Sequence, residues 1–87
     1  MNNSKYYDEL YSYAKNDIVP KYDELLSCTL QVLPEGFFIT FEFIFKIKEN
    51  ISEKQFNKLG KTISHELYHF CKKFGVENKF IVVLSRY

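Results

Sequence analysis

The chain begins with apolar side chains at helical spacing. Residues 4–26 carry this pattern, with tyrosines and leucines recurring every three or four positions. Pro20 interrupts it. Because proline lacks an amide hydrogen and clashes with the preceding turn, the sequence predicts a bend or a fresh start of the helix near Asp17.

A period of two follows and predicts two strands joined by a tight turn. Residues 27–33 and 37–47 alternate between apolar and polar positions, as a half-buried strand requires. The four residues Leu33-Pro34-Glu35-Gly36 suit the turn, because proline fixes one dihedral angle and glycine accepts a positive φ. The inward face of the second strand would carry Phe37, Ile39, Phe41, Phe43, Phe45 and Ile47.

The helical period returns after residue 50 and gives the best-marked element, a helix over about 53–74. Ser52 and Gln55 form a capping box at its start, and Gly75 is placed to end it in the left-handed conformation. The last nine residues, 79–87, are a nearly continuous apolar run that predicts a buried strand.

This order of elements predicts an α+β fold. We expect a single domain over residues 1–87, a small two-layer αββαβ arrangement. It has a three-stranded sheet with two helices on one face, because a strand, a helix and a strand favour a crossover into the same sheet. The order resembles a ferredoxin-like fold without its first strand. That likeness concerns element order only and implies no function.

Charge is distributed unevenly along the chain, although its formal total is only +1. Residues 1–45 contain seven acidic and three basic residues, whereas residues 46–87 contain nine basic and four acidic ones. Aromatic residues make up 18% of the chain, an unusually high share that comes from nine Phe and seven Tyr. The charge asymmetry bears on the choice of partners rather than on the fold.

Residues 65–69 read HELYH and fit the pattern H-E-x-x-H, in which two histidines hold zinc and the glutamate acts as general base. On a helical wheel, however, His65 and His69 lie about 200° and about 240° from the core stripe. A catalytic zinc also needs a third protein ligand, and neither Cys71 nor Glu77 is well placed to supply it. We therefore interpret the motif as a chance match, with weak surface binding of zinc by the two histidines as the alternative.

Basic side chains recur along one side of the same predicted helix, and no acidic residue interrupts them. This basic ridge consists of Lys54, Lys58, Lys61, His65, His69 and Lys72. It suits the phosphates of RNA or non-specific DNA, or an acidic protein surface. The alternative is a lysine-rich face that contacts only solvent. The ridge has no arginine, the preferred ligand of bases and phosphate forks, which argues against sequence-specific DNA recognition.

Two further surfaces are candidates for a protein interface. If both helices cover one face of the sheet, the other face exposes an apolar set that predicts a homodimer or a protein partner, unless the first helix covers part of it. This set is Leu33, Phe38, Ile44, Ile81, Val83 and Tyr87. Tyrosines such as Tyr6 and Tyr13 spread over a wide arc of the first helix. They indicate either an interface or the filling of the core by bulky side chains.

The sequence also bears on the compartment. The first ten residues contain no apolar stretch of the kind a secretory signal needs. The longest apolar run, FFITFEFIFKI, is too short to span a bilayer as a helix and contains Glu42 and Lys46. Cys28 and Cys71 fit no metal or redox motif, which is typical of reduced thiols, although a disulfide stays open. We expect a cytoplasmic protein with no membrane partner.

No glycine-rich phosphate loop occurs, and no serine or cysteine nucleophile has a histidine placed beside it. The sequence therefore predicts a non-enzymatic protein without catalytic residues or a cofactor. Our leading hypothesis is a small protein-binding domain, a stand-alone inhibitor or adaptor of the kind that phages and mobile elements encode. Binding of RNA or non-specific DNA through the basic ridge is the alternative, and a zinc hydrolase is the third hypothesis.

Overall fold

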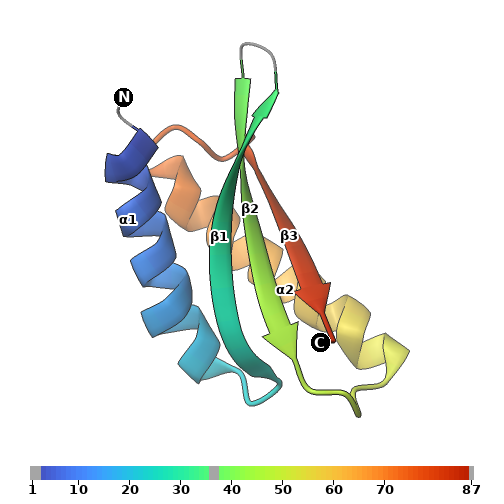
Figure 1. Ribbon diagram of the computed structural model, residues 1–87. Helices are drawn as coiled ribbons and strands as arrows, with labels where there is room; N and C mark the ends of the chain where they lie inside the picture. Colours follow the sequence, from blue (N-terminus) through green and yellow to red (C-terminus); the bar gives the residue numbers. More distant parts are fainter. Residues whose placement is uncertain (1–2, 36–37, 87) are drawn as a thin grey trace.

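Three strands form one mixed sheet in the computed structural model, which describes residues 3–35 and 38–86 (Figure 1). β1 (Leu25–Glu35) pairs antiparallel with the central strand β2 (Phe38–Ile47). β2 pairs in parallel with β3 (Phe80–Ser85). Two helices cover one face of this sheet, so the predicted two-layer αββαβ arrangement is confirmed.

The first helix is shorter than predicted and changes its type before it ends. The regular part, α1 (Asn3–Tyr13), is followed by a π-helical turn, η1 (Ala14–Ile18), and a 3-10 turn, η2 (Val19–Lys21). Pro20 lies in the 3-10 turn, where its missing amide hydrogen prevents a further α-helical turn. The helix type therefore changes in the region where the proline predicts an irregularity.

Leu25 belongs to β1, so the predicted continuation of the first helix to residue 26 is wrong. The amide of Leu25 donates to the carbonyl of Tyr22 over 3.1 Å, which closes a turn between helix and strand. Its side chain is buried, and in the sheet it lies opposite Ile47. A single buried leucine fits a helical and an extended pattern equally well, which explains the error.

β1 extends further along the chain than predicted. Pro34, which the sequence assigns to the turn, is paired with Ile39 of β2. Gly36 and Phe37, to which the sequence assigns the turn and an inward side chain, lie outside the described residues. The predicted interface residue Tyr87 and the side chain of Phe38 also lie outside the described part of the structure.

α2 (Glu53–Lys72) begins and ends as its sequence predicts. The hydroxyl of Ser52 accepts a hydrogen bond from the amide of Gln55 over 3.2 Å, and the Gln55 side chain accepts one from the amide of Ser52 over 3.3 Å. Gly75 has a φ of 72° just after the helix, the left-handed conformation that favours glycine. These caps fix where α2 begins, and therefore which of its side chains face β3.

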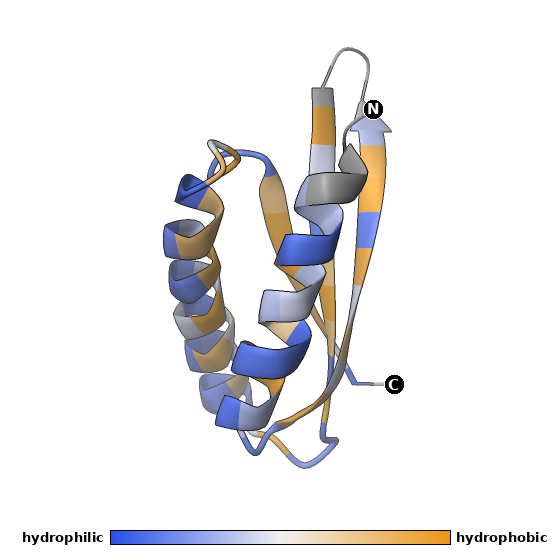
Figure 2. Cartoon of the chain, turned by 90° about the vertical axis from the view of Figure 1, so that its left-hand side faces the viewer, coloured by the Kyte–Doolittle hydropathy of each residue, from blue (hydrophilic) through white to orange (hydrophobic). Residues whose placement is uncertain are grey.

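The core fills the space between the helices and one face of the sheet. Figure 2 shows α2 with its hydrophobic side toward the strands and its hydrophilic side away from them. Cys28 and Cys71 are free thiols buried in this core. The largest side chains that are fully buried are Phe41, Phe43, Phe45, Leu10, Ile18, Ile47, Ile63 and Leu67.

β3 is an edge strand, and it is less buried than predicted. Phe80, Val82 and Leu84 pack against the core but remain half-buried, and Ile81 is 44% exposed. The sequence prediction of a buried strand is therefore wrong. An uncharged run of this kind is buried in the middle of a parallel sheet, whereas here, among the strands of residues 3–35 and 38–86, β3 pairs with β2 alone.

Backbone groups of alternate residues in β3 point to opposite sides of the strand. The amide of Phe41 donates to the carbonyl of Lys79 over 2.8 Å, and Phe41 is the register partner of Phe80. In a parallel pair this pattern directs the backbone of Ile81 and Val83 toward β2. The backbone groups of Phe80, Val82 and Leu84 consequently point away from β2, toward the free edge.

We predict an alternating pattern of amide hydrogen exchange along β3. The amides of Ile81 and Val83 should exchange slowly because they donate to β2, and those of Val82 and Leu84 should exchange quickly because they face the free edge. Exchange followed residue by residue by nuclear magnetic resonance measures this directly. Equal protection of all four amides would show that the edge is covered.

Candidate functional site

The histidines of the HELYH segment lie on the exposed side of α2. His65 and His69 are both exposed, and their rings meet edge to face with centroids 4.6 Å apart. Within the described residues, no cluster of three or more His, Cys, Asp or Glu side chains could hold a metal ion. The expectation that zinc binds here only weakly stays a prediction.

Glu66, the glutamate of the same segment, joins α2 to the end of the first helical segment. Its carboxylate accepts a hydrogen bond from Lys21 Nζ over 2.8 Å and another from the hydroxyl of Tyr22. Its side chain retains only 20% exposure. In a zinc hydrolase this carboxylate would face the metal-bound water, whereas here it binds two side chains of its own chain.

These contacts set the protonation of the cluster. Burial by itself raises the pKa of Glu66, but the hydrogen bonds from Lys21 and Tyr22, together with the charge of Lys21, lower it below its ordinary value of 4.5. Burial and the bond to Glu66 raise the pKa of Tyr22 to about 12. Glu66 is therefore ionised at neutral pH, which suits a structural ion pair.

The basic ridge lies entirely on the surface. All six of its members are exposed, as the helical wheel predicts. Among the residues that the structure describes, none of its lysines forms an ion pair, and the single pair found joins Lys21 to Glu66. The ridge therefore presents positive charge without an ion-pair partner along the exposed side of α2.

Tyr6 and Tyr13 lie between the two helices. The ring of Tyr13 stacks on that of Phe70 with centroids 3.9 Å apart and planes 4° apart, and Tyr6 lies 5.6 Å from Phe74. Both tyrosines are half-buried and pack against the core. Their rings thus pack against the core, and their role in an interface stays a prediction.

The predicted apolar set on the outer face of the sheet is divided by polar residues. Ile44 lies opposite Val83, and Ile81 follows on the same face of β3. Glu42 is the partner of Ile81 in the register and lies between this trio and Leu33, which belongs to β1. The outer face therefore offers a compact aliphatic trio beside the free edge of β3, smaller than the sequence predicts.

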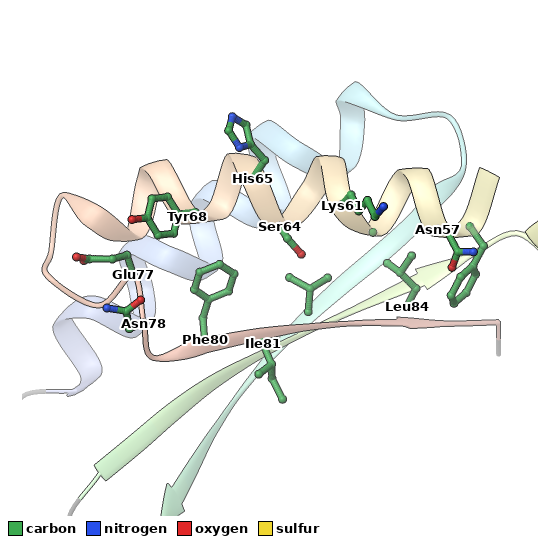
Figure 3. Close-up of a pocket in the computed structure, with 13 residues that line it drawn as sticks. Asn57, Lys61, Ser64, His65, Tyr68, Glu77, Asn78, Phe80, Ile81 and Leu84 are labelled. Carbon is green, nitrogen blue, oxygen red and sulfur yellow. The ribbon is translucent and has the colours of Figure 1, made fainter. Parts of the chain in front are cut away.

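A groove of ≈1100 Å³ runs between α2 and β3 and was not predicted from the sequence (Figure 3). Phe80 and Leu84 project from β3 toward α2, Ser64 projects from α2 toward the strand, and Ile81 points to the other side of β3. The groove is open to solvent, and its floor consists of the half-buried side chains Phe80, Val82 and Leu84.

Small residues on α2 keep this groove open. Gly60 and Ser64 face the strand at positions where larger side chains would cover the floor. A Cβ atom at Gly60 would lie 3.7 Å from Leu84 Cδ1, which is ordinary van der Waals contact. Packing therefore does not require glycine, although glycine inside a helix costs about 1 kcal/mol relative to alanine.

The two ends of the groove differ in charge. At the end where β3 finishes, Lys61 lines the groove, and the Arg86 guanidinium lies 5.0 Å from the centre of the Phe56 ring. At the other end, Glu77 Oε1 is buried and has no hydrogen-bond partner among the described residues, with Lys79 exposed nearby in the chain. The first end is therefore positive, whereas the second carries charges of both signs.

The sequence contains one signal for the groove. Gly60 is the weak position of an otherwise well-formed helix, and a helix-interior glycine often has a packing or functional reason. The other lining residues, from Phe56 to Leu84, are far apart in the chain and form a groove only because β3 lies at the sheet edge beside α2.

Comparison with known proteins gives no match: no family model, no curated protein and no solved structure is similar to this chain. The helices in the described part of the chain are all too short or too polar to cross a bilayer.

We predict that Glu66→Gln lowers stability at neutral pH by about 1 kcal/mol, because it weakens two hydrogen bonds to a carboxylate whose lysine partner is solvent-exposed. The folded pKa lies below the unfolded one, so this contribution is present above about pH 4.5 and is lost as the pH falls through the folded pKa. Urea unfolding of wild type and variant at about pH 7 and about pH 3 should show the larger difference at the higher pH.

Glu49→Gln serves as the matched control, since Glu49 is exposed in the connection between β2 and α2. It should change stability little at either pH. A Glu66→Gln variant as stable as wild type at neutral pH would show that the Lys21 and Tyr22 contacts contribute nothing to folding.

Proposed function

We propose that this chain is a small, non-enzymatic protein-binding domain, an inhibitor or adaptor, that docks its partner in the groove between α2 and β3. The observation that carries the proposal is the half-exposed apolar floor of Phe80, Val82 and Leu84. Apolar area removed from water contributes about 25 cal/mol per Å², so a chain gains stability by covering such side chains itself. A partner that binds in the groove removes this apolar area from water, and the same free energy then stabilises the complex.

Gly60 supports this proposal. Alanine fits at the position and would stabilise the helix, so glycine is the less stable choice for folding alone. A residue that lowers stability without a packing need is typical of a functional site, where activity and stability conflict. The role of Gly60 in the proposal is to leave room above Leu84 for the side chains of a partner.

The contacts of Glu66 support the non-enzymatic part of the proposal. The carboxylate that the HELYH motif would use as general base binds Lys21 and Tyr22, and holds the end of η2 against α2. Its role in this proposal is structural.

Selection from a library of random linear peptides tests the docking site. Peptides enriched on the wild-type protein should lose at least about tenfold in affinity for Gly60→Leu, because a leucine fills the groove above Leu84. Fluorescence anisotropy measures the affinities. Enriched peptides that bind Gly60→Leu as tightly as wild type, or a selection that enriches none, would contradict the proposal.

Gly60→Ala is the matched control for this experiment. The added methyl group meets Leu84 at ordinary contact distance, so the variant should gain about 0.5 to 1 kcal/mol in urea unfolding and keep most of its affinity. This pair of variants separates an effect of groove volume from an effect of helix stability.

Binding of RNA or non-specific DNA is a second candidate function, favoured by the complete exposure of the basic ridge and by its lack of ion pairs within the described residues. The ridge and the groove share Lys61 and His65, whereas Lys54, Lys58 and Lys72 do not line the groove. The two candidates can therefore be separated by changing ridge lysines outside the groove.

If the ridge binds phosphates, changing Lys54, Lys58 and Lys72 together to Gln should abolish a gel shift with single-stranded RNA or duplex DNA. Wild-type affinity should fall about a hundredfold between about 50 and about 200 mM salt, because each neutralised phosphate releases counterions. The absence of any gel shift at the lower salt concentration would show that the ridge contacts only solvent. The triple variant should keep its peptide affinity in either case.

A further inference from the structure

Residues of the edge strand β3 line the groove from Phe80 to Leu84. Phe80, Val82 and Leu84 line the floor of the groove, and the pairing with β2 directs the backbone groups of these same residues outward. A chain lying in the groove beside β3 would therefore meet apolar side chains and backbone hydrogen-bonding groups at the same time.

The two edges of the sheet differ in their protection. On β1, the Tyr7 hydroxyl of α1 donates to the carbonyl of Leu30 over 2.8 Å, and Pro34 removes one amide donor. β3 has no proline, no charged residue and no bulge in its described span Phe80–Ser85. Natural sheets normally protect an edge with such devices, because an unprotected edge pairs with other chains.

Both faces of β3 are apolar at this edge. Toward α2 it presents the groove floor, and on the outer side it presents Ile81 beside Val83 and Ile44. A strand added here would have alternate side chains in the groove and alternate side chains against this outer trio. The two surfaces thus fit the two faces of a single extended segment.

We infer that β3 binds an extended segment of a partner protein by strand addition, and that this segment runs antiparallel to β3 with acidic residues near its N-terminal end. The inference deepens the proposed function and rests on it. Its basis is that the free edge of β3 lies between a groove opened by Gly60 on one face of the sheet and the apolar outer trio on the other.

Charge sets the position of the acidic end of the segment, and the preference for antiparallel pairing sets its direction. Lys61 and Arg86 make the end of the groove next to the C-terminal end of β3 positive, whereas Glu77 lies at the opposite end. In an antiparallel pair the N-terminal end of the bound segment lies beside Arg86. Acidic residues at that end complement the two cations, and antiparallel pairing is the more stable arrangement.

The same charges disfavour a second copy of this chain as the occupant. Pairing of β3 with β3 of another copy around a twofold axis would bring Arg86 of each copy to the end at which Lys79 of the other lies. Like charges close together across strands are destabilising. An acidic segment from a different protein removes this repulsion and adds attraction.

The probe is the peptide acetyl-Glu-Glu-Val-Thr-Val-Thr-Val-Thr-amide with a fluorescent label, titrated with the full chain in an anisotropy assay. We expect a Kd on the order of 10 to 100 µM, because the probe offers backbone pairing and apolar contacts but no optimised side chains. Binding should also slow hydrogen exchange at the amides of Val82 and Leu84, which point outward, and leave that of Val83 unchanged.

Methylation of alternate backbone nitrogens of the peptide is the matched control. It removes the amide donors on one edge and keeps every side chain, so each of the two N-methylated forms blocks pairing on one edge. One form should lose at least about tenfold in affinity, and the other should bind nearly as well as the parent peptide. Equal affinity of all three peptides would overturn strand addition.

Two further comparisons test the direction and the charge. A peptide with its two glutamates at the C-terminal end should bind more weakly than the parent, and equal or tighter binding would overturn the antiparallel direction.

Arg86→Glu should weaken binding of the parent peptide and strengthen binding of a version with two lysines in place of the glutamates. Arg86 is exposed, so this change leaves the core intact.

The outcomes separate this inference from the proposed function. If library peptides bind in a Gly60-dependent way and N-methylation has no effect on them or on the probe, groove docking stands and strand addition fails. If neither library peptides nor the probe bind, both fail. A doubled mass in light scattering that the probe peptide reverses would identify a second copy as the occupant and overturn the assignment to a foreign acidic segment.

Discussion

Three buried phenylalanines on the central strand hold the two layers together. Phe41, Phe43 and Phe45 are fully buried, and they occupy successive inward positions of β2. Because β2 is hydrogen-bonded on both sides, its neighbours fix the direction in which these rings point. Truncation of a buried phenylalanine to alanine typically costs 3 to 5 kcal/mol, roughly a third or more of a small domain's stability. The position of α2, and with it the groove, depends on this row of rings.

The sequence predicts those parts of the fold in which several local signals agree. β2 alternates over its whole length, and α2 combines a helical period with the cap residues Ser52 and Gln55. Prediction from the sequence fails where one residue fits both a helical and an extended pattern, as Leu25 does. It also fails where the burial of a strand depends on the order of strands in the sheet. The run that forms β3 looks like a central strand, and only the observed order β1-β2-β3 places it at an edge.

The features of the candidate site also differ in whether local sequence patterns can predict them. The basic ridge lies on a single helix, so a helical wheel was sufficient to predict that its members are exposed together. The groove forms because Gly60 and Leu84, which are 24 positions apart in the sequence, lie close together in the fold. No local sequence pattern indicates this proximity. Tyr13 was assigned two possible roles from its arc on the helix, and its stacking on Phe70 is a long-range contact of the same kind.

The parallel pairing of β2 with β3 also affects how the chain folds during synthesis. β1 and β2 are neighbours in sequence and can pair as soon as both have left the ribosome, whereas β3 follows β2 only after 32 further residues. Until then the second edge of β2 is unpaired, and when β3 arrives the unpaired edge passes to β3 itself. During folding an open strand edge therefore exists first on β2 and then on β3, and crowding during synthesis favours pairing between chains at that edge.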